Sequence, residues 1–201
     1  DTLEPGPEPD ARRPWTLEDW EDSVWLSGTT GIGYDYADLI GLNVSAMRHV
    51  NETVYIRIPF VVDDPSAIRA LTLHRRYEDG MIAYINGQEV ARDNAPAPTT
   101  ETWNSGALAN RSDSIAIDPV EFSIPEFDFL HVGTNVLAVQ GLNHGTGSSD
   151  LLCGEELLAT VATEPGQAQR YFPAPTPGSR IMRASNCSDR SSLMRRIPRT
   201  C

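Results

Sequence analysis

The chain has no lysine: all 16 of its basic residues are arginine, against 28 Asp and Glu, so its 201 residues carry a formal net charge of −12. Proteins that bind nucleic acid or anionic membranes need clustered cations, so this charge balance disfavours both as partners. No apolar run approaches the roughly 18 residues that a membrane-spanning helix requires. We therefore expect neither nucleic-acid binding nor membrane insertion.

Cysteine is scarce, with residues only at Cys153, Cys187 and Cys201. None of them forms a CxxC pair, so a zinc site is not expected. Cys153 lies in an apolar run and is predicted to be a small buried side chain. A disulfide between Cys187 and Cys201 is possible, but it would connect only residues of the predicted tail. The sequence therefore leaves the disulfide state of the three cysteines open.

Motifs for catalysis are missing too. The four histidines stand at no metal or triad spacing, and no GxSxG, HExxH or P-loop pattern occurs. The Gly-rich stretch from Gly28 to Gly33 is not followed at once by a helix, so it is interpreted as a loop that needs positive φ rather than as a phosphate cradle. The chain is therefore predicted not to be an enzyme.

What the chain does contain is a body between two chain ends of different composition. Residues 1–14 are rich in proline and acidic side chains and are predicted to be a linker. Residues 164–201 are rich in Pro, Ser and Arg and are predicted to be a linker followed by a disordered tail. Removing residues 180–201 should then leave the melting temperature nearly unchanged. The remaining range, 15–163, is predicted to be one domain.

Strand patterns fill this domain. In residues 53–62, Val54, Ile56, Ile58, Phe60 and Val62 alternate with more polar residues, which is typical of a strand with one buried face. Residues 70–92 contain three strand-like runs separated by Asp79-Gly80 and by Asn86-Gly87. Since Asn-Gly tolerates positive φ at both positions, it is a strong hairpin signal. We expect a three-stranded meander here.

Further short apolar runs follow in the second half, at residues 121–124, 135–143 and 151–161. The total is about eight short strands with one or two helical turns, one of them opened by Pro65. No helix–strand alternation is visible. The predicted fold is therefore all-β: a two-sheet antiparallel β-sandwich or jelly roll.

Candidate ligand-binding residues lie in predicted loops. Trp103 stands in a polar loop, where an indole can stack on a sugar ring, although it could equally pack as a lid over the end of the sandwich. Asn104, Asn143 and Asp150 lie near strand ends, where they could hold a hydroxyl group or Ca²⁺, or simply cap turns. Calcium takes six to eight oxygen ligands, which the sequence alone does not assemble. No cofactor is expected, and Ca²⁺ is left open.

A family resemblance is carried by several segments together: YEDGMIAYINGQEVARDNAP, WNS, GTNVLAVQGLNHGTGSSDLL and EELLA, preceded by WLSGTTGIGYD and NETVYIRIPFVVDDPSAI. This pattern resembles a galactose-binding-domain-like jelly-roll module of large secreted bacterial proteins, where it occurs beside lamin-tail, spore-coat-protein-H-like or glycoside hydrolase domains. The segment RYFPAPTPGS resembles the linker that follows the module. The family has no agreed catalytic residues, so none is transferred.

The resemblance implies a non-catalytic, monomeric module in an extracellular or cell-surface protein. Its expected partner is a carbohydrate or a neighbouring domain of the same protein. One alternative is a structural spacer that packs on a neighbouring enzyme; another is an accessory fragment of a glycoside hydrolase. An open polar groove with exposed aromatic side chains would favour carbohydrate binding, whereas an exposed apolar patch with a buried Trp103 would favour the spacer.

Overall fold

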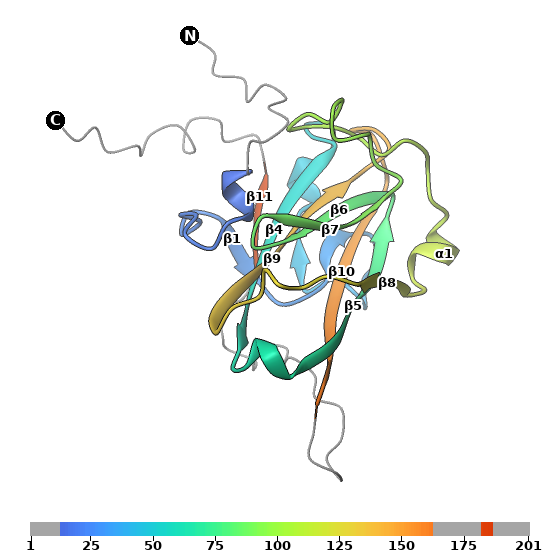
Figure 1. Ribbon diagram of the computed structural model, residues 1–201. Helices are drawn as coiled ribbons and strands as arrows, with labels where there is room; N and C mark the ends of the chain where they lie inside the picture. The colour runs from blue at the N-terminus through green and yellow to red at the C-terminus, as the bar shows by residue number, and fades with distance from the viewer. Residues whose placement is uncertain (1–12, 163–181, 187–201) are drawn as a thin grey trace, which may run out of the picture.

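The structure is a computed structural model that describes residues 13–162 and 182–186 (Figure 1). It consists of two sheets packed face to face, so the predicted all-β sandwich is confirmed. The six-stranded sheet contains, in spatial order, β1 (Leu26–Gly28), β11 (Met182–Asn186), β4 (Thr53–Val62), β9 (Gly133–Leu142), β6 (Gly80–Ile85) and β7 (Gln88–Asp93). The five-stranded sheet contains β3 (Leu42–Asn43), β2 (Ile32–Tyr34), β10 (Leu151–Val161), β5 (Ile68–Glu78) and β8 (Val120–Ile124).

Neighbouring strands are antiparallel except for the short pair β2 and β3. Helical structure among the described residues is limited to four single turns: η1 (Pro14–Thr16), η2 (Ser45–Met47), η3 (Pro65–Ala67) and α1 (Asp113–Ala116). The predicted turn at Pro65 is η3, and the side chain of Asp64 accepts a hydrogen bond from the backbone N–H of Ser66 at 2.9 Å. No described helix is long and apolar enough to cross a membrane.

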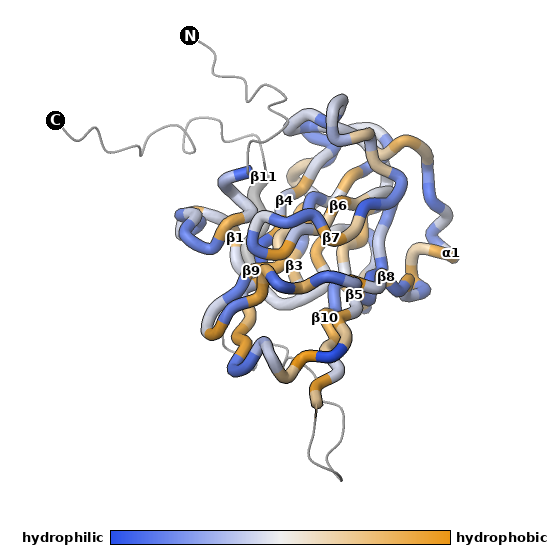
Figure 2. The backbone as a smooth tube through the Cα atoms, in the orientation of Figure 1, coloured by the Kyte–Doolittle hydropathy of each residue, from blue (hydrophilic) through white to orange (hydrophobic). Residues whose placement is uncertain are grey.

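The main core lies between the two sheets and forms because the strands alternate in polarity. In β4, Val54, Ile56 and Val62 face this core as predicted. Figure 2 shows apolar positions along the strands and mainly hydrophilic connecting loops. Pro59, which cannot donate to a ladder, lies beyond the part of β4 that pairs with β11, where the described strands leave that edge open.

The hairpin at Asn86-Gly87 is confirmed: both residues have positive φ, and they join β6 to β7. The predicted three-stranded meander is wrong, however, because β5 belongs to the other sheet. The chain changes sheets at Asp79, a fully buried residue. Its N–H donates to the carbonyl of Leu142, and its carboxylate accepts from the backbone N–H groups of Arg111 and His144 at 2.7 Å. These non-local hydrogen bonds make the segment a crossover rather than a tight hairpin turn.

One strand lies within the range predicted to be a linker and tail. β11 is inserted between β1 and β4 and is antiparallel to both, and β1 has no other strand partner among the described residues. The expectation of a tail without secondary structure therefore does not hold for these five residues. The predicted linker at residues 1–12, most of the predicted tail, Cys187 and Cys201 lie outside the described residues.

Candidate functional site

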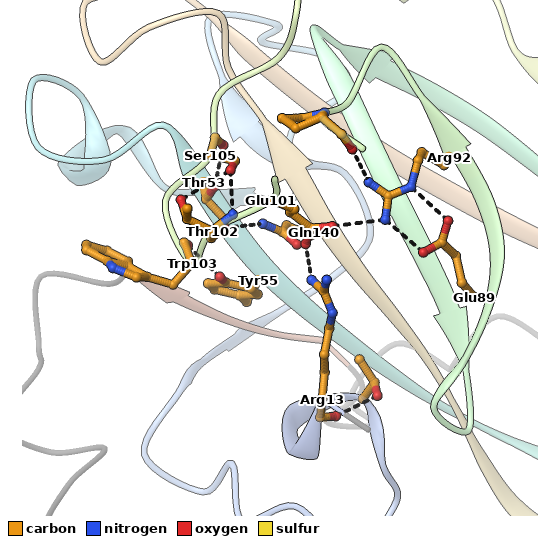
Figure 3. Close-up of polar contacts among 12 residues, drawn as sticks. Arg13, Thr53, Tyr55, Glu89, Arg92, Glu101, Thr102, Trp103, Ser105 and Gln140 are labelled. Atoms are coloured by element: carbon orange, nitrogen blue, oxygen red, sulfur yellow. Dashed lines mark hydrogen bonds and ion pairs between the residues drawn. The ribbon is translucent and has the colours of Figure 1, made fainter. Parts of the chain in front are cut away.

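Trp103 and Asn104, two of the predicted ligand-binding residues, lie on a loop that crosses the outer face of the six-stranded sheet. The Trp103 carbonyl accepts a hydrogen bond from the hydroxyl of Tyr55, and the indole is half-buried. Figure 3 shows that the indole points away from Glu101 and Gln140. The Asn104 side-chain oxygen accepts from the backbone N–H groups of Glu52 at 2.9 Å and Thr53 at 3.4 Å. Asn104 thus anchors its loop to the start of β4.

Asn143 and Asp150 are connected by a chain of hydrogen bonds at the end of the sandwich. The Asn143 amide donates to the hydroxyl of Tyr34 at 2.9 Å, and that hydroxyl donates to the carbonyl of Ser148 at 3.3 Å. The hydroxyl of Ser148 donates to Asp150 at 3.1 Å. Asn143 also donates its N–H to the carbonyl of Glu52 at 2.8 Å, so the structure brings Asn104, Asn143 and Asp150 into one neighbourhood. Trp103, which precedes Asn104 in the chain, is held through its carbonyl by the hydroxyl of Tyr55.

Asp150 also belongs to a cluster of carboxylates with Glu78 and Asp113, whose ligand atoms all lie within 4.8 Å of one another. Glu78 is buried and accepts a hydrogen bond from the hydroxyl of Tyr36. Burial, followed by the charge of Asp150, raises the pKa of Glu78 to about 8. Burial raises the pKa of Asp150 as well. These three side chains could supply part of the six to eight oxygens that Ca²⁺ takes.

A groove of about 290 Å³ lies over the outer face of the five-stranded sheet. Outward-facing side chains of β5 and β10 form its floor, and the loops on either side of β2 form a wall. The polar and apolar groups that line it include Thr30, Asp38, His74, Arg76, Leu152 and Glu156. Because strand register fixes the floor of this groove, its side chains are held on a rigid support.

The floor of the groove carries acidic side chains on both sides of a histidine. His74 on β5 stands directly opposite Glu156 of β10 and Glu121 of β8. The imidazole Nε2 of His74 lies 3.4 Å from Glu121 Oε1. Arg76, two residues further along β5, is exposed and donates from Nε to the carbonyl of Ile117 at 2.8 Å. The groove therefore offers hydrogen-bond donors and acceptors side by side.

One wall of the groove depends on a glycine. Gly31 has a φ of +82°, and a Cβ atom there would come within 1.8 Å of the carbonyl oxygen of Leu39. The predicted requirement for positive φ in this Gly-rich loop is thus confirmed at Gly31. No candidate residue from the sequence analysis lines the groove. The outward positions of residues 70–77 could have indicated it, but the same alternation is typical of an ordinary solvated strand face.

Comparison with known proteins adds little to this geometry. No family model matches the chain, and no curated protein matches it. Among solved structures, the chain is similar to an α-L-rhamnosidase from Streptomyces avermitilis, complexed with L-rhamnose, with 20% sequence identity and a TM-score of 0.41. The match covers 71% of this chain and 11% of the rhamnosidase chain. The fold assignment therefore rests on the strand topology itself.

Proposed function

We propose that the chain is a non-catalytic carbohydrate-binding module, of the galactose-binding-like jelly-roll type, from a larger extracellular protein, and that the groove over β5 and β10 holds the sugar. The observation that supports this most is the open polar groove, because hydroxyl groups of a sugar ring both donate and accept hydrogen bonds. His74, Arg76 and Glu156 present both kinds of group on one surface. The volume of the groove also falls at the lower end of the range of known ligand pockets, at about 300 Å³.

The charge of the molecule favours a neutral sugar. Between residues 13 and 162 there are eight arginines and 22 acidic residues. In the groove, Arg76 stands with Asp38 and Glu156, so the exposed charges are predominantly negative there too. A uronate, sulfate or phosphate group would be repelled by this field. We therefore expect neutral glycans to bind and acidic glycans to be rejected.

A glycan array with the full chain tests the proposal, run once with Ca²⁺ and once with a chelator. Arg76→Ala and Glu156→Gln should each abolish binding, since both change the groove without touching the core. Arg69→Ala is the matched control, because Arg69 is an exposed arginine on the same strand but outside the groove. The glycans recovered after incubation should be intact, as expected for a module without catalysis.

The outcomes separate the sites. If Trp103→Ala abolishes binding while Arg76→Ala binds normally, the sugar binds on the six-stranded sheet, and the assignment of the groove as the binding site is wrong. If binding is lost only when the chelator is present, binding requires a cation, and the cluster of Glu78, Asp113 and Asp150 is the candidate site for it. Absence of binding to every glycan would refute carbohydrate recognition itself.

A docking role is the second candidate, and one observation favours it. Leu108, Ile115 and Ile117, around α1, are 66%, 53% and 44% exposed. Exposed apolar side chains on one segment are typical of contacts with another protein surface. If glycans fail to bind, replacing Ile115 and Ile117 by serine should weaken the packing of a neighbouring domain in the full-length protein, measured as a lower shared melting temperature.

A further inference from the structure

The outer face of the six-stranded sheet is covered by residues 13–22, here called the arm. The arm contains η1 but pairs with no strand among the described residues. It is held instead by Arg57 of β4, which is 3% exposed. The Arg57 guanidinium donates to the backbone carbonyls of Trp15, Leu17 (2.7 Å) and Glu18 (3.4 Å). Arg57 also donates from Nε to the carboxylate of Asp22 at 2.9 Å, so it holds the arm through both main-chain and side-chain oxygens.

Several side chains of the arm make specific contacts: Asp22 forms an ion pair with Arg57 at 2.9 Å, Glu18 contacts His131, and Trp15 and Arg13 contact the sheet. The ring of Trp15 packs edge-on against Tyr55 and Tyr84, with centroids 4.8 and 5.8 Å apart. Arg13 forms an ion pair with Glu101, a carboxylate with no exposed side-chain surface. Figure 3 shows Arg13 extending from the arm to Glu101. Arg92 of β7 holds Glu101 Oε2 at 2.9 Å, so Oε1, beside the aromatic surface, is the oxygen that pairs with the basic residue of the arm.

The arm leaves part of this surface unsatisfied. Tyr84 is 4% exposed and Gln140 is fully buried. The Tyr84 hydroxyl and the Gln140 side-chain oxygen make no hydrogen bond to any described residue. One is a donor and the other an acceptor, and a buried polar group without a partner costs about 1–3 kcal/mol. The face therefore offers hydrogen bonds that its present occupant does not use.

We propose that this face is a docking site for a peptide that carries a basic residue two positions before an aromatic one, and that the arm is its intramolecular occupant. The arm leaves the face while the sandwich stays folded, and a peptide of the same chemistry takes its place. A peptide with a hydroxyl or amide side chain able to reach Tyr84 and Gln140 would bind more tightly than the arm sequence. This site lies on the sheet opposite the proposed sugar groove.

Peptide binding tests the proposal directly. The full chain with Arg13→Ala and Trp15→Ala should bind a fluorescent peptide of residues 13–23, whereas the unchanged chain should bind it at least about tenfold more weakly because its own arm competes. A peptide in which Arg13 and Trp15 are replaced by alanine is the control. Equal binding of the two peptides, or no binding to the folded variant, would overturn the proposal. Arg76→Ala should leave peptide binding unchanged, which separates this site from the sugar groove.

Thiol labelling gives a second test that keeps Arg13 and Trp15 of the arm unchanged. Thr16 is a fully buried residue of the arm, and Cys153 is fully buried in the main core. In a chain with Thr16→Cys and with Cys187 and Cys201 changed to serine, the thiol introduced at position 16 should react at least about tenfold faster than the thiol of Cys153, which reports global unfolding. Equal rates would mean that the arm leaves only when the whole domain unfolds, and the proposal would fail.

Discussion

The ion pair between Arg75 and Glu155 gives the sharpest prediction on stability. Arg75 on β5 and Glu155 on β10 stand directly opposite each other, and neither side chain has exposed surface. Arg75 Nη2 lies 2.8 Å from Glu155 Oε1. The Nε and Nη1 atoms of Arg75 and the Oε2 atom of Glu155 make no hydrogen bond to a described residue. Both charged groups have thus lost their contacts with water, and hydrogen bonds within the protein replace only part of them.

Removing one partner should be costly. Glu155→Leu leaves a buried guanidinium without its counter-charge, which typically costs about 3–5 kcal/mol. For a domain of this size each kcal/mol lowers the melting temperature by roughly 2–4 °C. Glu155→Leu should therefore lower the melting temperature by at least about 6 °C, and Arg75→Met should act similarly because it leaves a buried carboxylate.

Replacing both partners should cost far less than the sum of the single changes. A buried ion pair exchanged for apolar side chains of similar volume is often neutral or stabilises by about 1–4 kcal/mol. The double variant Arg75→Met/Glu155→Leu is therefore expected to have at least the stability of the unchanged chain. Urea denaturation of all four proteins at pH 7, with equal slopes, gives the coupling free energy. If the single changes cost under about 1 kcal/mol, or if the costs simply add, the reasoning is refuted.

Three further predictions concern other contacts. Because the pKa of Glu78 is raised to about 8 in the fold from 4.5 in the unfolded chain, its contribution to stability is complete below pH 4.5 and is lost as pH rises through 8. The check is thermal unfolding from pH 5 to 9 with a chelator present. The Glu78→Gln variant should be more stable than the unchanged chain at pH 8 but not at pH 5. Melting temperatures of the two proteins that change in parallel with pH would contradict this. Asn104→Ala removes the acceptor for two backbone N–H groups, so it should cost about 1–3 kcal/mol in urea denaturation, and a cost near zero would contradict the anchoring role. Deleting residues 180–201 should lower the melting temperature, since β4 loses a partner at Val54–Arg57 and β1 loses its partner; an unchanged value would support the original expectation of a tail.

Local patterns predicted the elements whose cause is local. The alternation in residues 53–62 is set by one buried face, and the hairpin at Asn86-Gly87 is set by two positive φ values, so both could be predicted from a few residues. The crossover at Asp79 could not, because Asp79-Gly80 has the composition of a tight turn. What distinguishes it is the set of hydrogen bonds from Arg111 and His144, which are far away in sequence.

β11 escaped prediction for a different reason. Its residues, Met182–Asn186, show no hydrophobic alternation and lie in an arginine-rich stretch. Pairing with β1 and β4 needs only main-chain donors and acceptors, which every such segment has. A strand that joins a sheet through its backbone leaves little trace in the sequence.

The candidate sites also differ in whether their cause is local in the sequence. The sequence indicates Trp103, Asn104, Asn143 and Asp150 only as separate loop residues. In the structure three of them lie together, because Glu52, Tyr34 and Ser148 connect Asn104, Asn143 and Asp150 by hydrogen bonds. The groove is different, because it arises from the outward face of two strands that are distant in sequence. Its polar pattern is indistinguishable from a solvated face until β10 is placed beside β5.

The two outer faces of the sandwich therefore make opposite demands on a ligand. The groove over β5 and β10 is open and predominantly negative, so a ligand there needs neutral hydroxyl groups and meets no competing segment among its lining residues. The opposite face is already occupied by the arm, so a ligand there must displace the contacts of Arg13, Asp22 and Glu18 with Glu101, Arg57 and His131, and the three hydrogen bonds that Arg57 makes with backbone carbonyls. Binding to the groove should accordingly be independent of the arm, whereas peptide binding should strengthen as the arm is weakened. A sugar affinity that changed with Arg13→Ala would contradict this separation.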